Sequence, residues 1–224
     1  MMTDDLTCAS LFREPDSSLA LRFLARYRYP WEILSDIPDI LRTIAQTLPS
    51  DLYDEIQPGV FVARSATVAP SALLSAPCII GEGAEIRHCA FIRGAALVGR
   101  HAVVGNSVEL KNCILFDRAQ VPHFNYVGDS ILGFRAHMGA GAVTSNVKSD
   151  KSDITVSCQG IKTETGCRKF GAALGDGVEV GCHCVLNPGT VIGPNSRIYP
   201  LSSVRGYVPA DSIFKDPDHI VKIL

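Results

Sequence analysis

The stretch from Phe61 to Gln120 divides without a gap into ten blocks of six residues: FVARSA, TVAPSA, LLSAPC, IIGEGA, EIRHCA, FIRGAA, LVGRHA, VVGNSV, ELKNCI and LFDRAQ. The second residue of every block is apolar, from Val62 to Phe116. The same phase returns at Leu174, Val180, Leu186, Ile192, Ile198 and Val204. A period of six fits neither a 3.6-residue helix nor an alternating strand. It is typical of a parallel β-helix built from hexapeptides.

In such a solenoid each block forms a short strand followed by a corner, and three consecutive blocks close one coil. The large apolar residue of each block points inward, and stacking the coils buries a continuous apolar column. The sixteen anchors on one period argue against an ordinary β-sandwich. We therefore predict an all-β solenoid.

The composition excludes several classes of protein. The 224 residues are 46% hydrophobic, which argues against intrinsic disorder. The formal charge of −2 argues against a nucleic-acid-binding surface, which usually carries a strong basic excess. No apolar run reaches the roughly 18 residues that span a membrane, and the N-terminus lacks a secretory pattern. We expect a cytoplasmic protein with no nucleic-acid or membrane partner.

The eight cysteines form no CxxC pair, and Cys182-His183-Cys184 is the only close set among them. That spacing is weak evidence for a metal. We expect free thiols, most of them buried as small apolar residues, and no metal site.

Two segments lie outside the repeat. The pattern of residues 1–58 predicts a helical cap. One helix should run from Asp16 or Ser17 to about Tyr27, and another from about Pro30 to Leu48. We expect this cap to cover the open end of the column, although a docking element or lid is the alternative. Residues 59–224 then form the β-helix domain, with an inserted loop at about 147–172 in which residues 154–156 favour a strand. The loop either reaches an active site or is a solvated excursion.

Candidate chemistry lies between Arg93 and Asn146. Lys111 follows Arg93 by three blocks, so the two side chains should stack on adjacent coils and create a natural phosphate site. His123 follows nearby and is suited to accept a proton near neutral pH. An ordinary solvated face is the alternative interpretation of the same residues.

The segment VELKNCILFDRAQVPHFNYVGDSILGFRAHMGAGAVTSN, residues 108–146, resembles the acetyltransferase half of bacterial N-acetylglucosamine-1-phosphate uridyltransferase/glucosamine-1-phosphate acetyltransferase. That family belongs to the hexapeptide-repeat transferases. The resemblance implies a left-handed parallel β-helix and a homotrimer with active sites between neighbouring columns. It also implies acetyl-CoA as co-substrate, no metal, and a phosphorylated amino sugar or nucleotide sugar as acceptor.

The resemblance assigns roles residue by residue. His123 corresponds to the general base. The acceptor-binding positions correspond to Arg93, Lys111, Tyr126, His137 and Lys169. The coenzyme A positions correspond to Ala140, Asn146, Cys182 and, by a looser alignment, Lys215.

Several positions depart from the family pattern. His137 replaces an asparagine, Val147 a tyrosine and Cys182 a serine, and the loop 147–172 is longer. Residues 1–58 are too short for the family's nucleotidyltransferase domain, so we do not expect uridyl transfer. A non-catalytic trimeric module of sugar-nucleotide metabolism is the main alternative function. A zinc carbonic anhydrase of the same fold is a remote one, because no two histidines have the required five-residue spacing.

Overall fold

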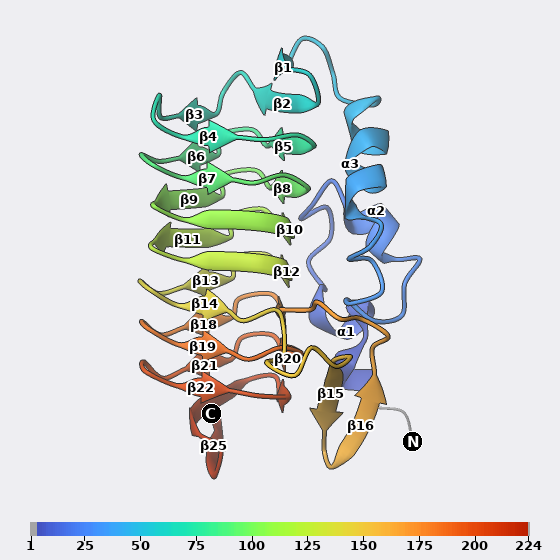
Figure 1. The fold of residues 1–224 in the computed structure, drawn as a ribbon, viewed down its shortest axis with the longest axis vertical. Coiled ribbons are helices and arrows are strands. Elements are labelled where there is room, and N and C mark those ends of the chain that lie inside the picture. The colour runs from blue at the N-terminus through green and yellow to red at the C-terminus, as the bar shows by residue number, and fades with distance from the viewer. Residues whose placement is uncertain (1–3, 224) are drawn as a thin grey trace.

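The computed structural model describes residues 4–223, and their strands stack into a parallel β-solenoid of about nine turns (Figure 1). The register follows the predicted coil of three blocks in the first half of the stack, where Cys78 pairs with Ala96 and Glu85 with Val103. The hexapeptide prediction of a β-solenoid is therefore confirmed.

The solenoid has three flat sides. The helix face contains β2 (Val60–Ala63), β5 (Cys78–Ile80), β8 (Ala96–Val98), the ends of β10 (Glu109–Leu115) and β12 (Tyr126–Leu132), β17 (Ala172–Leu174), β20 (Thr190–Ile192) and β23 (Tyr207–Val208). The second face contains β4 (Leu73–Leu74), β7 (Phe91–Ile92), the starts of β10 and β12, β14 (Val143–Thr144), β19 (Val185–Leu186) and β22 (Ser203–Val204).

The third face contains β3 (Thr67–Val68), β6 (Glu85–Ile86), β9 (Val103–Asn106), β11 (Gln120–His123), β13 (His137–Met138), β18 (Glu179–Val180), β21 (Arg197–Ile198) and β24 (Ser212–Asp216). Antiparallel strands finish both ends of the stack. β1 (Tyr53–Gln57) pairs with β2, and β25 (His219–Lys222) pairs with β24. These two strands cover edges that would otherwise offer unpaired backbone groups.

The interior column is built from the repeated apolar residues, and Ile80, Ile92 and Leu110 are completely buried in it. One anchor was predicted wrongly. The coil from Val98 to Leu115 is one residue short, because Leu115 pairs with Val98 in the register. Leu115 therefore fills the column, and Phe116 points outward, where its ring centroid lies 5.0 Å from that of Phe12.

The N-terminal segment forms η1 (Asp4–Leu6), α1 (Cys8–Leu11), α2 (Leu21–Leu24) and α3 (Ile37–Ala45), which are shorter than the predicted helices. These elements lie along the helix face and not over the open end of the column (Figure 1). The reason is that the helix face has apolar residues on its outer side as well. The buried stripe of α3 shares one apolar cluster with the outer residues Ile79, Leu97 and Ile114.

The inserted loop carries a hairpin of β15 (Thr155–Cys158) and β16 (Ile161–Glu164), so the strand predicted near residue 154 is present. The N-terminal segment holds the base of this loop. The rings of Trp31 and Phe170 have centroids 5.8 Å apart, and the Cys167 thiol lies 3.7 Å from the Trp31 carbonyl oxygen. Across residues 4–223, no helix is both long enough and apolar enough to cross a membrane.

Candidate functional site

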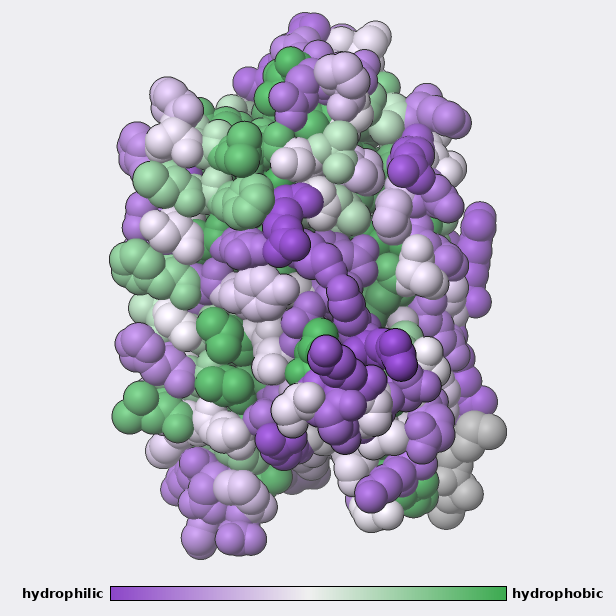
Figure 2. Space-filling view, viewed as in Figure 1, coloured by the Kyte–Doolittle hydropathy of each residue, from purple (hydrophilic) through white to green (hydrophobic). Residues whose placement is uncertain are grey.

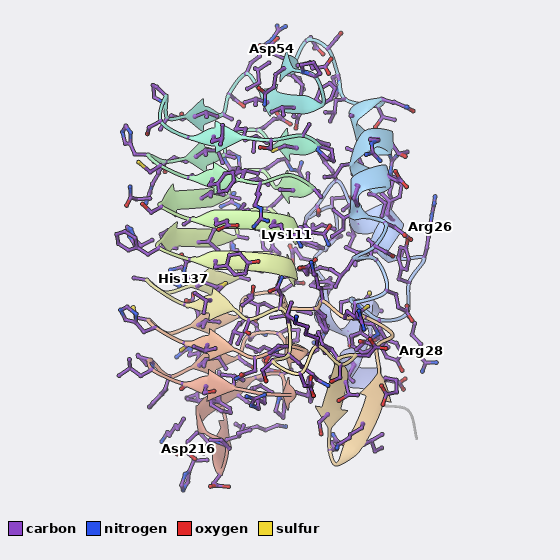
Figure 3. The ribbon with its side chains drawn as sticks, in the orientation of Figure 1. Arg26, Arg28, Asp54, Lys111, His137 and Asp216 are labelled. Atoms are coloured by element: carbon purple, nitrogen blue, oxygen red, sulfur yellow. The ribbon has the colours of Figure 1, made fainter. Side chains whose placement is uncertain are left out.

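The corner between the second face and the helix face brings Arg93 and Lys111 onto adjacent coils. Glu109 and Leu110 pair with Phe91 and Ile92, so Lys111 follows Arg93 by one coil, as the spacing predicted. Figure 3 labels Lys111 on β10, in the middle of the stack. The strand register, set by the inward-pointing aliphatic residues, thus aligns two cations along one corner.

Asp129 links the side chains at this corner. It is almost fully buried, and its carboxylate lies 3.2 Å from the Lys111 ammonium group. The same carboxylate accepts hydrogen bonds from the side-chain amides of Asn112, at 2.9 Å, and Asn146. The Asn112 amide also donates to the Leu34 carbonyl, at 3.0 Å. The N-terminal segment therefore contacts the network that positions Lys111.

Arg93 is paired as well. Its guanidinium donates to the Glu109 carboxylate at 2.8 Å, on a side chain that is about half exposed. This hydrogen bond raises the pKa of Arg93 above its usual range. Arginine has five N–H donors and a lysine ammonium has three. Both cations therefore keep donors for a ligand while they contact their carboxylates.

Tyr126 lies beside this network on the start of β12. Its hydroxyl accepts a hydrogen bond of 3.3 Å from the Asn146 amide. Burial of the phenol raises the pKa of Tyr126, and the nearby Asp129 carboxylate acts in the same direction. The phenol is therefore neutral at physiological pH and is able to donate a hydrogen bond.

His123 lies at the next corner, at the end of β11, with an exposed side chain. Its backbone is fixed on both sides: the amide donates to the Asn125 side-chain oxygen at 3.1 Å, and the carbonyl accepts from Gly141 at 3.0 Å. Within residues 4–223 its imidazole forms no hydrogen bond or ion pair. A fixed backbone with an unpartnered ring leaves both ring nitrogens open to a ligand.

Ala140 and Cys182 follow along the corner of His123. The Ala140 carbonyl accepts from the His183 amide at 2.8 Å, so these two positions lie on adjacent coils, and the Cys182 side chain is exposed. His137 instead lies on the third face, where its ring nitrogen is 2.9 Å from the Glu179 carboxylate (Figure 3).

The two remaining lysines differ in their relation to the network. Lys169 is exposed at the end of the inserted loop, and the amide of its neighbour Phe170 donates to the Asn146 carbonyl at 3.1 Å. Lys215 lies on β24 near the end of the solenoid, with its ammonium group 5.8 Å from the Tyr199 ring centroid. The structure thus connects Lys169 to the network and places Lys215 farther along the corner of Ala140 and Cys182, because Val180 pairs with Ile198 and Ile198 pairs with Phe214.

Two asparagines were not assigned roles from the sequence. Asn112 connects Asp129 to the N-terminal segment. Asn125 is buried and donates to the carbonyls of Gly139 and Ala142, at 2.8 and 2.9 Å, while it accepts from His123. In the sequence, Asn125 could have been recognised as a structural residue because it is a polar residue next to the apolar positions of the repeat. Across residues 4–223, no three histidine, cysteine or acidic residues are grouped so as to hold a metal ion.

Comparison with known proteins shows which proteins the chain resembles. The model of the GMPPB C-terminal domain matches residues 74–171. The Bifunctional protein GlmU of Methanococcus vannielii is 32% identical over 196 residues, which are 86% of this chain and 47% of that protein. A bifunctional sugar-1-phosphate nucleotidylyltransferase/acetyltransferase of Sulfurisphaera tokodaii is 33% identical over 105 residues, 47% of this chain and 26% of that protein.

The GlmU relatives match most of this chain, but the chain spans only about half of their length. Among solved structures, a mutant of AntD, an N-acyltransferase from Bacillus cereus in complex with dTDP and coenzyme A, aligns over 73% of this chain and 80% of that one. Its sequence identity is 15% and its TM-score is 0.39. The chain is therefore a hexapeptide-repeat β-solenoid that resembles the C-terminal half of GlmU.

Proposed function

We propose that the chain is an acetyl-CoA-dependent acetyltransferase whose acceptor is an amino-sugar phosphate or a nucleotide sugar. The observation that carries the proposal is the exposed, unpartnered imidazole of His123 on a backbone held from both sides. It lies in the segment that resembles the family's acetyltransferase most closely. The relationship to GlmU over 86% of the chain supports the same activity.

In the proposed reaction, His123 accepts a proton from the amine of the sugar. The amine nitrogen attacks the thioester carbonyl and forms the new C–N bond. The C–S bond then breaks, and the proton passes from the imidazolium to the departing coenzyme A thiolate. Positioning the amine beside the thioester supplies much of the rate enhancement, and a positioned base adds about 10²- to 10⁴-fold.

The acceptor's phosphate would be held by Arg93 and Lys111, with Tyr126 and Lys169 contacting the remainder of the acceptor. His137 lies on the third face, so it would contact an acceptor from a neighbouring copy of the chain. Coenzyme A would lie along Ala140, Asn146, Cys182 and Lys215. A phosphate at Arg93 and Lys111 shares these cations with Glu109 and Asp129. Because each cation keeps N–H donors that its carboxylate does not use, the paired cations remain suitable for a phosphate.

A non-catalytic module is the second candidate, and the internal pairing of both cations favours it. The two candidates are separated by mixing the protein with acetyl-CoA and glucosamine-1-phosphate, or with other amino sugars, and recording the mass of the sugar product. We expect a product heavier by one acetyl group. Absence of product with every acceptor, together with absence of coenzyme A binding, would favour the module.

We also propose that the second face meets neighbouring copies in a homotrimer. This face exposes large apolar side chains, with Leu73 59%, Phe91 36% and Val185 38% exposed, and Figure 2 shows apolar residues over the same strand stack. Burying them against another copy is favourable. Sedimentation equilibrium should give about three times the chain mass of 24.1 kDa. A mass equal to one chain would contradict this assembly.

A further inference from the structure

A row of cationic side chains follows the corner between the third face and the helix face. His101, Arg118 and Arg135 occupy equivalent positions on three successive coils, because Gln120 pairs with Val103 on one side and with His137 on the other. All three have left-handed backbones, with φ of 55°, 60° and 57°. Neighbouring strands are about 4.8 Å apart, so the three side chains leave the corner close together. We name His101, Arg118 and Arg135 the cationic ridge.

The arginines of the cationic ridge carry uncompensated charge. Within residues 4–223, neither the Arg118 nor the Arg135 guanidinium forms a hydrogen bond or an ion pair, and Arg135 lies 5.0 Å from the Phe134 ring centroid. Arg93 and Lys111, by contrast, both contact carboxylates. The two arginines of the cationic ridge are therefore without the carboxylate contacts that engage Arg93 and Lys111.

A hollow of about 500 Å³ lies beside the cationic ridge, and its lining is strongly polar: His101, Arg118, Gln120, Arg135, His137 and Glu179. Glu179 is the acidic residue of this lining, and it is already engaged by His137 at 2.9 Å. The neighbouring Asp117 carboxylate is bound by Arg100 at 2.6 Å. Glu179 and Asp117 thus have partners of their own. Glu14 and Asp16 line an adjoining hollow with Arg118 and are not part of the lining of the 500 Å³ hollow. The two guanidinium groups therefore remain available to a ligand in the larger hollow.

We propose that the cationic ridge binds a diphosphate group, carried either by a nucleoside diphosphate or by coenzyme A. Each guanidinium presents a planar fork of N–H donors that matches one phosphoryl group. Two forks on adjacent coils match two linked phosphoryl groups better than one orthophosphate. The imidazole of His101 and the side-chain amide of Gln120 supply further donors to the same hollow.

The position of the ridge fits a ligand that extends toward His123. Arg118 and His123 lie on the same coil, and β11 joins Gln120 to His123. An extended chain of five residues spans about 17 Å at most. The ridge and the imidazole therefore lie near the two ends of one short strand, no more than about 17 Å apart along the backbone. The binding of diphosphate to the ridge does not depend on the proposed acetyl transfer.

The test is calorimetric titration of the full chain with orthophosphate, inorganic pyrophosphate, UDP and coenzyme A, repeated with Arg118→Gln/Arg135→Gln. We expect pyrophosphate to bind more tightly than orthophosphate. Loss of two charged contacts should weaken pyrophosphate at least about tenfold. The nucleotide that weakens in parallel, UDP or coenzyme A, identifies the source of the diphosphate.

The matched control is Arg22→Gln/Arg205→Gln, which removes the same charge from exposed positions elsewhere. It should keep the wild-type affinity. Arg118 and Arg135 are exposed, so their replacement should leave the unfolding temperature unchanged. The proposal is wrong if wild-type protein does not bind pyrophosphate, if both double variants weaken it equally, or if orthophosphate binds as tightly as pyrophosphate.

Discussion

His123→Ala should lower kcat for acetyl transfer by about 10²- to 10⁴-fold, the usual contribution of a positioned general base. The loss should appear mainly in kcat. An imidazole that accepts a proton in the transition state contributes little to the binding of the substrate in the ground state. The backbone of residue 123 is held by Asn125 and Gly141, and its side chain is exposed. Alanine should therefore leave the fold and coenzyme A binding intact.

The measurement is the steady-state rate of acetylated sugar formation, recorded by mass for the wild type and the variant. His88→Ala is the matched control, because the His88 side chain is also exposed and lies on the same corner. Asn106 connects the two positions: its side-chain amide donates to the His88 carbonyl, and its backbone pairs with His123 in the strand register. We expect the control to retain full activity. Equal rates for His123→Ala and the wild type would remove His123 from the mechanism.

The path of the solenoid could be predicted because the interior admits one kind of residue at one spacing. The apolar residues from Val62 to Leu110 repeat every six positions and point into the column. The shorter coil at Leu115 could not be predicted from that pattern. Ile114, Leu115 and Phe116 are all apolar, so either Leu115 or Phe116 could be the residue that points into the column. The contact of Phe116 with Phe12, far away in sequence, accompanies the register that the structure adopts.

The position of the N-terminal segment could have been predicted from apolar residues that lie next to the inward-pointing residues of the repeat. Ile79 and Leu97 are one coil apart, beside the inward residues Ile80 and Val98. Apolar residues on both sides of a strand indicate that both of its faces are buried. This side therefore needed a cover, and the N-terminal helices provide it along the side of the column.

In the candidate site, the sequence predicts only which residues lie at equivalent positions on adjacent coils. The spacing of three blocks aligns Arg93 with Lys111, and the register agrees. The contacts of these cations with Glu109 and Asp129 depend on side-chain rotamers, which the period does not determine. Each step of the cationic ridge, from His101 to Arg118 and on to Arg135, is one residue shorter than three blocks, so a search at the regular period misses it.

Gly105→Ala should destabilise the protein by about 3 kcal/mol or more, at the upper end of the range for overpacking a rigid interior. Gly105 lies on β9, directly opposite Pro122 of the neighbouring coil. A methyl group at residue 105 would lie 1.5 Å from the Pro122 carbonyl oxygen and 2.0 Å from its carbon. These are backbone atoms of a paired strand, so the collision cannot be relieved by rotating a side chain.

Thermal unfolding measures this effect, and a loss of about 3 kcal/mol corresponds to a decrease of about 6–12 °C in Tm for a chain of this size. Gly160→Ala is the control, because its methyl group would meet no atom within 4 Å and carries only the strain of a left-handed φ of 79°. That strain costs about 1–2 kcal/mol. Equal changes in Tm for the two variants would show that the coils can separate at Pro122. A larger loss at Gly105 would show that close packing of adjacent coils fixes the strand that ends in His123.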